Sequence, residues 1–406
     1  MNRTIALTSL LASADYVRTV FARREITLLE IVDGDLDFAP GDVDPRGILR
    51  KTADTRVEAF RYRADDLRPT AQALAAAGPA FVFYGYEHDL ASADGLAQLV
   101  CPDFANDPAT SAARERKDET DRLLCERGYP VPREVSFRLH EPFDEHQLDS
   151  FGDSVIIKPV RYAGTHAIVS KDSVLAWLQT ARRAEPDREA SYTAQELLID
   201  WDADGMQQTY SIDGFAIGGE YHVVSLQRWR KFVFNDGFRY CWADQLDVAA
   251  PEHAALLAHT KEVLQVLGLK NGFFHPEFTE SPEGLVLIDL NPRVAGADGV
   301  VDKMIAAAQG VGVIDTFVDT AFGAPKLTPG PRHHVRLLAI YGLADGEPET
   351  IAGLPSFQEL VSSKILHCHF VLFAHHDAEQ VTADAELCYQ RFIASRYAHK
   401  ARLAPR

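Results

Sequence analysis

Apolar and polar positions in the first hundred residues follow two patterns, continuous apolar runs and apolar residues at helical spacing. Apolar runs, which are typical of buried strands, lie at residues 4–11, 26–33, 57–63 and 80–90. Helical spacing is found at residues 14–24, 68–78 and 93–100. Strands that alternate with helices predict a parallel sheet with helices on its faces. No GxGxxG pattern follows the first run, so a dinucleotide site has no support.

The next hundred residues combine a charged helical segment with a short mixed segment. Residues 106–133 favour a helix that ends at Gly128, because prolines follow that glycine. Further on, strands are expected at residues 153–160 and 191–199, with a helix at 173–184 between them. We therefore expect a small α+β unit over residues 134–215.

Residues 271–298 read as a β-hairpin followed by a polar loop. Apolar residues 273–278 and 285–291 form the two expected strands, and Pro282 and Gly284 indicate a turn between them. Side chains alternate between the two faces of a strand. If the turn centres near Glu283, Glu277 and Asp289 fall opposite each other.

Two further polar side chains extend this pattern. Asn291 shares the face of Asp289, and Arg293 follows just past the strand end. Burying this much charge is unfavourable without compensation, and a Mg²⁺ ion with carboxylate and phosphate oxygens would supply it. The alternative, which the spacing alone leaves open, is that Asp289 and Asn291 merely end a strand while Glu277 is exposed.

The rest of the chain alternates strands and helices. We expect paired strands over residues 210–229, a helix over 253–268, a helical segment over 300–323 broken at glycines, and a linker over 324–331. Residues 333–399 favour two apolar strands and a terminal helix. His367 and His369 share a strand face there and offer two ligands to zinc, but no third ligand is evident, and a mixed strand surface is the favoured interpretation.

The composition excludes several classes of function. The 406 residues are 46% hydrophobic and 25% charged, as in soluble globular proteins, and the formal charge is −18. Such a charge argues against non-specific binding to nucleic acids or anionic membranes, although a local basic cleft for a nucleotide remains compatible with it. No signal peptide or membrane-spanning run is evident, and five cysteines without a CxxC pattern favour a reduced, cytoplasmic protein.

Three isolated charged residues are further candidates. Lys158 lies in an apolar strand and must find an anion or extend outward, and a tight turn containing Gly164 and Thr165 follows, which suits phosphate. Lys117 lies in the charged helix, where a solvated helix face is the simpler interpretation. Glu87 follows a strand of the expected parallel sheet, where small ligands often bind, although the spacing alone slightly favours an exposed loop acid.

Several ordered motifs from about Ala80 to the end of the chain together resemble one family. HPEF followed by LIDLNPRVAG is similar to the signature H-x-E…(I/L)-(E/D)-x-N-P-R-x-x-G, and YSIDGF, IIKPVRYAGTHAIV, NDPATSAARERK and YGYEHDL follow the family's other motifs in order. The family is the ATP-grasp carboxylate–amine ligases, and the chain most resembles their L-amino-acid ligase and natural-product dipeptide synthetase branch.

The resemblance implies an α/β (α+β) protein with the ATP-grasp fold. Its parts would be a Rossmann-like N-terminal domain with a parallel sheet over 1–105, a linking helix over 106–133, a small α+β lid over 134–205, a catalytic core over 206–325, and the C-terminal part of a large antiparallel-sheet domain over 326–406. It also implies ATP with Mg²⁺ or Mn²⁺ as cofactors, small-molecule carboxylate and amine substrates, and allows a homodimer.

The family's nucleotide and metal residues can be carried over by position. Lys117 and Lys158 would contact the phosphates, with Gly164 and Thr165 in the phosphate loop. Glu196 would mark the hinge at which the backbone of Leu197 and Leu198 meets the adenine. Glu277 and Asp289 would hold the metal with help from Asn291. Arg293 would stabilise the transferred phosphoryl group, and His275 would orient Glu277 or border the substrate.

Substrate residues and departures from the family pattern follow from the same resemblance. Glu87 would receive an amino group, Arg228, Arg230 and Lys231 are candidates for a carboxylate or phosphates, and the small Ala297 would leave room for a bulky substrate. Thr209 stands where the family has a ribose-binding Glu, and Ala167 replaces a glycine of the phosphate loop, which makes the loop stiffer.

The implied reaction is ADP-forming amide synthesis through an acyl phosphate, as in antibiotic biosynthesis. The product would be a dipeptide or a related small natural product. An intramolecular lactam synthetase, a ligase or carboxylase of primary metabolism, and a degenerate protein that binds ATP without catalysis are the alternatives.

Overall fold

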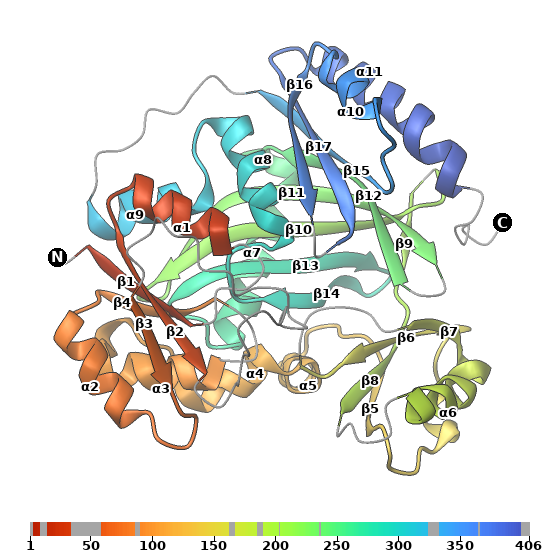
Figure 1. Ribbon diagram of the computed structural model, residues 1–406. Helices are drawn as coiled ribbons and strands as arrows, with labels where there is room; N and C mark the ends of the chain where they lie inside the picture. Colours follow the sequence, from red (N-terminus) through yellow and green to blue (C-terminus); the bar gives the residue numbers. More distant parts are fainter. Residues whose placement is uncertain are drawn as a thin grey trace.

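The computed structural model describes residues 3–8, 14–33, 58–85, 90–161, 167–184, 190–202, 204–234, 237–323, 333–363 and 366–398. Glu87, Gly164 and Thr165 therefore lie outside the described residues, as does the 324–331 linker. Three sheets organise the described part of the chain: one in the N-terminal region at the lower left of Figure 1, one in a small unit at the lower right, and a large one above and between them.

The N-terminal sheet is parallel throughout, as the alternation of strands and helices predicts. Its strand order is β3 (Glu58–Tyr62), β2 (Thr27–Asp33), β1 (Thr4–Thr8) and β4 (Phe81–Tyr84). The helices that accompany it are α1 (Ala14–Arg23), α2 (Arg68–Ala77) and α3 (Leu90–Val100). Ile5 and Ala6 are both fully buried but belong to different apolar clusters, so the sheet is covered on both faces.

The segment expected to be one helix over 106–133 is two helices, and that prediction was wrong in this detail. α4 (Ser111–Glu115) ends at Arg116, whose backbone is extended, and α5 (Lys117–Glu126) begins directly after it. The amide of Lys117 donates to the carbonyl of Val160, 3.0 Å away. The break thus places Lys117 at the start of a helix and against the small unit.

The small unit is an antiparallel sheet with one covering helix. The strand order is β5 (Glu134–Arg138), β8 (Ser191–Glu196), β6 (Ser154–Pro159) and β7 (Ala167–Ser170). α6 (Val174–Ala184) packs on the face that carries Val155, Ile157, Tyr192 and Ala194. The residues that alternate with these along β6 and β8 therefore face the large sheet, and they are Ile156, Lys158, Thr193 and Gln195.

Within the described residues, the large sheet has nine antiparallel strands. Along its path they are β14 (Gly284–Asn291), β13 (Gly272–Ser281), β10 (Gln207–Ile217), β11 (Glu220–Phe234), β12 (Gly237–Leu246), β15 (His334–Ile340), β17 (Cys368–His375) and β16 (Phe357–Ser363), with β9 (Asp200–Trp201) beside β10. Two strands were expected after residue 333, but β16 is a third, half-exposed strand whose apolar alternation is weak.

Helices cover both faces of the large sheet (Figure 1). α7 (Ala254–Val266) packs on the face that carries Ile212, Leu226 and Phe274. α8 (Val300–Gln309) and α9 (Val313–Phe322) pack on the other face together with α1, and they break near Gly310 and Gly312 as predicted. α10 (Glu347–Ala352) and α11 (Ala378–Tyr389) flank the C-terminal strands.

Within the described ranges, no single helix is long and apolar enough to cross a membrane. α8 and α9 together have sufficient length and apolar content, but the two helices are bent by 74° relative to each other.

A buried ion pair joins the N-terminal part of the chain to the large domain. Arg114 donates to Asp94 on α3 at 2.5 Å and to the carbonyl oxygens of Leu267 and Gly268, just after α7, at 3.1 and 2.8 Å. Both charged side chains are almost wholly buried. A cation at a helix C-terminus also interacts favourably with the helix dipole.

Replacing Arg114 with methionine should lower the free energy of unfolding by about 3–5 kcal/mol, because Asp94 would stay buried without a cation. Urea denaturation monitored by circular dichroism measures this loss. Arg122, whose guanidinium is exposed and pairs with Glu119 and Glu126, is the matched control, and Arg122→Met should leave stability nearly unchanged. Equal effects of the two substitutions would contradict the structural role of Arg114.

Candidate active site

The β13–β14 hairpin brings two carboxylates together as the sequence predicts. Glu277 is paired with Asp289 and His275 with Asn291 in the strand register. The turn is tighter than expected, because β13 continues to Ser281 and only two residues connect it to β14. The alternative of an exposed Glu277 is wrong, since its side chain is only 14% exposed.

Three lysines from three separate elements surround this carboxylate pair. Lys117 Nζ at the start of α5 lies 3.0 Å from Asp289 Oδ1. Lys231 Nζ on β11 donates to Glu277 Oε2 at 2.6 Å. Lys158 Nζ on β6 donates to the carbonyl oxygen of Ile288 at 2.9 Å. The two acids are therefore neutralised by cations that the linking helix and two different sheets supply.

The lysines determine the ionisation of both acids. Burial alone would raise the pKa of Asp289, but the charges of Lys117 and Lys158 outweigh it and lower the pKa to about 2. Burial opposes ionisation of Glu277 too, yet Lys231 lowers its pKa below the usual value. Both groups are carboxylates at neutral pH.

Asn291 and Arg293 complete one side of the cluster. Arg293 Nη2 donates to Asn291 Oδ1 at 2.9 Å, and Asn291 Nδ2 donates to Asp289 Oδ2 at 3.3 Å. Arg293 also donates to its neighbour's carbonyl oxygen, that of Val294, at 3.1 Å. The guanidinium is buried and held beside the acids. Two carboxylates and an amide oxygen form a donor set that a hard divalent cation accepts.

His275 is fixed by an acid on the neighbouring strand β10. Its Nδ1 lies 2.9 Å from Asp213 Oδ1, and its Nε2 lies 3.9 Å from Glu277 Oε1. Burial favours the neutral imidazole, but the charge of Asp213 and its hydrogen bond outweigh burial and raise the pKa of His275. Asp213 thus orients the ring and favours its protonated form next to Glu277.

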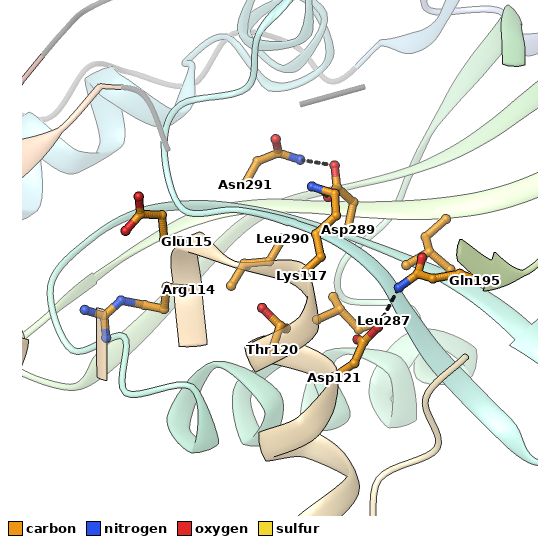
Figure 2. A pocket seen from close by; sticks show the side chains of 11 residues that line it. Arg114, Glu115, Lys117, Thr120, Asp121, Gln195, Leu287, Asp289, Leu290 and Asn291 are labelled. Carbon is orange, nitrogen blue, oxygen red and sulfur yellow. Dashed lines mark hydrogen bonds and ion pairs between the residues drawn. The ribbon is translucent and has the colours of Figure 1, made fainter. Parts of the chain in front are cut away.

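A pocket opens beside this cluster, between the linking helices, the small unit and β14 (Figure 2). About 440 Å³ of space without protein atoms lies there, part of which is open to bulk solvent. The residues that line it are Arg114, Glu115, Lys117, Thr120, Asp121, Gln195, Leu287, Ile288, Asp289, Leu290 and Asn291.

The predicted hinge residues lie at the edge of the small unit. The carboxylate of Glu196 accepts from Arg133 at 2.8 and 2.9 Å and from the amide of Gly152 at 3.0 Å. The amide of Leu197 donates to the carbonyl of Ser154, and the carbonyl of Leu198 accepts from Gln207. Their contribution to nucleotide binding stays a prediction.

Thr209, the residue predicted near the ribose, lies within β10. Its side chain is fully buried, and the strand register places it opposite Trp229.

Arg228 and Arg230 are not brought to the carboxylate pair. Both alternate with Lys231 along β11 and so point to the opposite face of the sheet. Arg228 pairs there with Asp244 at 3.1 Å, and Arg230 pairs with Asp202 at 2.9 Å. Their predicted contact with substrate finds no support from this placement.

The remaining candidates are residues whose side chains the structure does not describe and the histidines near residue 369. The backbone of Ala297 begins a short 3-10 turn, Ala297–Gly299, but its side chain lies outside the description, like Glu87 and the phosphate loop. His369 contacts Ser362 at 2.9 Å. Across the described residues, no three His, Cys, Asp or Glu side chains gather in a way that could hold a metal, so the zinc interpretation gains no third ligand.

The contacts of two side chains at the carboxylate pair were not foreseen from the sequence. Lys231 was grouped with Arg228 and Arg230 as a basic stretch, although strand alternation separates it from both. Asp213 was not considered, and its contact with His275 depends on the pairing of β10 with β13. The first signal was available in the sequence, whereas the second required the strand order.

The fold is shared with solved structures of other proteins. The chain has the ATP-grasp fold, and the resemblance inferred from its motifs is confirmed at that level. It superposes on an L-amino acid ligase from Bacillus licheniformis with a TM-score of 0.68 at 15% identity, covering 96% of this chain and 97% of that one. For an N5-carboxyaminoimidazole ribonucleotide synthetase from Thermus thermophilus the TM-score is 0.61 at 13% identity, with 96% and 98% covered.

A relative is also found by sequence. The chain is 28% identical over 221 residues to a dapdiamide A synthase from Enterobacter agglomerans. The match spans 53% of this chain and 50% of that protein, so the chain covers half of the relative's length. No family model matches the chain.

Replacing Asp213 with asparagine should lower the pKa of His275 relative to the wild-type protein, because burial would then act without the opposing carboxylate. An NMR titration of the imidazole C–H signals, with His275→Gln for assignment, measures the change. Asp244→Asn, which removes a carboxylate from the other sheet face, should leave the His275 titration unaltered. An unchanged pKa in Asp213→Asn would contradict the proposed orientation of the ring.

Proposed function

We propose that this protein is an ATP-dependent, ADP-forming carboxylate–amine ligase. The observation that carries the proposal is the carboxylate pair of Glu277 and Asp289 surrounded by Lys117, Lys158 and Lys231, with Arg293 beside it. These side chains suit a triphosphate with a bound metal ion. The carboxylates would bind the metal ion, and the lysines and Arg293 would bind the negatively charged phosphates. The fold shared with ATP-grasp ligases supports the same conclusion.

The metal and the nucleotide would bind together. Two carboxylates and one amide oxygen are too few ligands for an octahedral Mg²⁺, so phosphate oxygens and water must complete the shell. When bound, Mg²⁺ supplies charge neutralisation at the phosphates. Lys117 and Lys231, which pair with the acids in this structure, then become available to the phosphate oxygens.

The first chemical step transfers the γ-phosphoryl group to a substrate carboxylate. The bond between the γ-phosphorus and the bridging oxygen breaks, a bond to a carboxylate oxygen forms, and ADP leaves. Positioning and electrostatic stabilisation supply the catalysis. Arg293 and the lysines stabilise the charge on the transferred group.

The second step makes the amide. An amine attacks the carbonyl carbon of the acyl phosphate, a C–N bond forms, inorganic phosphate leaves, and the amine gives up a proton. Water must be excluded until the amine arrives, and closure of the small unit over the pocket serves this purpose. We propose an amino-acid-like carboxylate and a separate amine, as the similarity to a dapdiamide A synthase and to an L-amino acid ligase suggests.

The alternatives are less well supported. A binding-only protein has no need to retain the carboxylate pair, the lysines and Arg293 together. A lactam synthetase would use the same phosphoryl machinery, and it differs only in that one molecule carries both reacting groups. We also propose a cytoplasmic location, which suits five cysteines that are all free thiols.

Amino-acid-dependent release of ADP, and not AMP, is the expected result when the protein is incubated with Mg·ATP and a panel of amino acids, singly and in pairs. Coupled enzyme assays distinguish the two nucleotides, and mass spectrometry identifies the amide. Release that needs two different substrates supports intermolecular ligation. Stimulated AMP release would refute the acyl phosphate route, and nucleotide binding without turnover for any substrate would favour the binding-only alternative.

Arg293→Ala and Asp289→Asn should each lower kcat by about 10²–10³-fold, because each removes a charge that the transition state requires. Arg63→Ala and Asp65→Asn, which alter an exposed ion pair in the N-terminal domain, are matched controls with wild-type rates. Glu277→Gln should raise the Mg²⁺ concentration needed for half-maximal rate. Wild-type kinetics in Arg293→Ala would place the active centre elsewhere.

A further inference from the structure

The chain makes a strained turn shortly after Arg293. Asp298 and Gly299 both have a positive φ, of 57° and 79°, at the point where α8 begins. A left-handed backbone is unfavourable for a residue with a Cβ, such as Asp298, and it persists only where neighbouring groups hold it. Other parts of the molecule must therefore hold this turn.

Tyr16, on α1 of the N-terminal domain, contacts this region at two points. Its side chain lies against Gly299, where a Cβ would come within 2.3–2.7 Å of Tyr16 atoms, so only glycine fits there. Its hydroxyl donates to Asp302 Oδ2 in the first turn of α8, 2.8 Å away. The N-terminal domain thus supports both the turn and the helix that follows it.

Asp302 also holds the start of α9. This residue is 1% exposed, and its Oδ1 accepts from the amide of Val313, the first residue of α9. The carboxylate lies so close to Gly312 that a Cβ there would come within 2.5–2.7 Å of its atoms. One buried carboxylate therefore fixes the starts of α8 and α9 relative to the hydroxyl of Tyr16.

The C-terminal end of α1 is anchored on α9. The two helices lie side by side (Figure 1). Arg23 and Arg24 pair with Asp315 at 2.6 and 3.1 Å, and Arg24 also pairs with Asp319. These ion pairs fix the position of α1, and with it that of Tyr16, on the large domain.

The packing continues from Tyr16 to Arg293. Val294 packs against the same apolar cluster as Tyr16, and that cluster includes Ala295 and Val300. The carbonyl oxygen of Val294 accepts from Arg293 Nη1 at 3.1 Å. Because the chain between Arg293 and the turn is short and packs on one cluster, a displacement of Tyr16 would move the backbone beside the guanidinium.

We propose that Tyr16 is a positioning residue that makes the placement of Arg293 depend on the docking of the N-terminal domain. The inference rests on the proposed function, in which Arg293 stabilises the transferred phosphoryl group. Tyr16 acts through the turn and through Asp302, and the reacting atoms lie at the carboxylate pair. With α1 displaced, the turn would lose its support, and the guanidinium would no longer be held in the orientation that phosphoryl transfer requires.

The charge of Asp302 provides a readout that a merely structural contact lacks. Burial raises the pKa of Asp302 to about 6, and the charges of Asp315 and Asp213 add to the rise, whereas hydrogen bonds from Tyr16 and the Val313 amide oppose it. Loss of the Tyr16 hydroxyl should therefore raise this pKa further. Since ionised Asp302 holds the turn, kcat should fall as the pH drops through this pKa, and the fall should begin at a higher pH without the hydroxyl.

Tyr16→Phe tests the inference, because it keeps the ring on Gly299 and removes only the hydroxyl. At saturation with the amino acids that stimulate ADP release, kcat at neutral pH should fall about tenfold while the KM for ATP stays within about twofold. The acid limb of the kcat profile should shift to higher pH. Tyr221→Phe, which removes a hydroxyl that donates to Leu269 O at 2.8 Å, is the matched control and should behave as wild type. In Asp302→Asn, whose side chain cannot titrate, adding Tyr16→Phe should leave the acid limb in place.

Hydrogen–deuterium exchange followed by mass spectrometry examines the turn without any turnover. Amides in the peptide that spans residues 293–301 should exchange about tenfold faster in Tyr16→Phe than in the wild type or in Tyr221→Phe. Unchanged exchange in Tyr16→Phe overturns the inference, as does a wild-type kcat in the folded variant with only a lower melting temperature. Absence of substrate-dependent ADP release from the wild type refutes the ligase, and the exchange rates then still decide whether Tyr16 holds the turn.

Discussion

Glu277 and Asp289 face each other on adjacent strands, and two like charges in that position repel unless cations compensate them. No single element supplies the compensation. Lys117 comes from the linking helix, Lys158 from the small unit and Lys231 from the neighbouring part of the large sheet. The charge balance of the hairpin therefore requires three parts of the chain to meet, and a displacement of any of them would leave a buried carboxylate without its partner. The same requirement explains why a helix break at Arg116 matters, because it is there that the chain turns Lys117 toward the acids.

A site balanced in this way is prepared for an anionic ligand that carries its own cation. In the proposed reaction, Mg·ATP replaces the lysines at the carboxylates with a metal and gives the lysines phosphate oxygens instead. Binding would thus replace one set of ion pairs with another and would leave few of the protein's charges unpaired. The free-energy cost of desolvation would be correspondingly small. The hydrogen bond between Arg293 and Asn291 does not involve these lysines. It would therefore hold the guanidinium in place when charge develops on the transferred phosphoryl group. Asp213 holds the ring of His275 in place near Glu277.

Sequence reasoning succeeded where a local rule determines the geometry. Strand alternation and a short turn were enough to place Glu277 opposite Asp289, and alternating strands and helices were enough for the parallel N-terminal sheet. It failed where the outcome depends on packing between distant segments. The break at Arg116 is stabilised by a contact of Lys117 with Val160 in another unit, and β16 is a weakly patterned strand that forms because β17 offers it an edge. Arg228 and Arg230 were grouped with Lys231 as candidates for the substrate pocket, although alternation alone sends these two arginines to the other face.

The placement of these residues separates chemistry from recognition. The acids, the lysines and Arg293 lie on or directly beside regular strands and helices, where register fixes distances between them and tolerates little change. Gln195, on a strand of the small unit, is held by Glu134 from that unit and by Asp121 from the linking helix. Asp121 can hold the amide only while the small unit rests against α5, so this contact ties the two parts of the chain together. Substrate choice can therefore change through loops while the register of the strands keeps the carboxylate–lysine cluster unaltered.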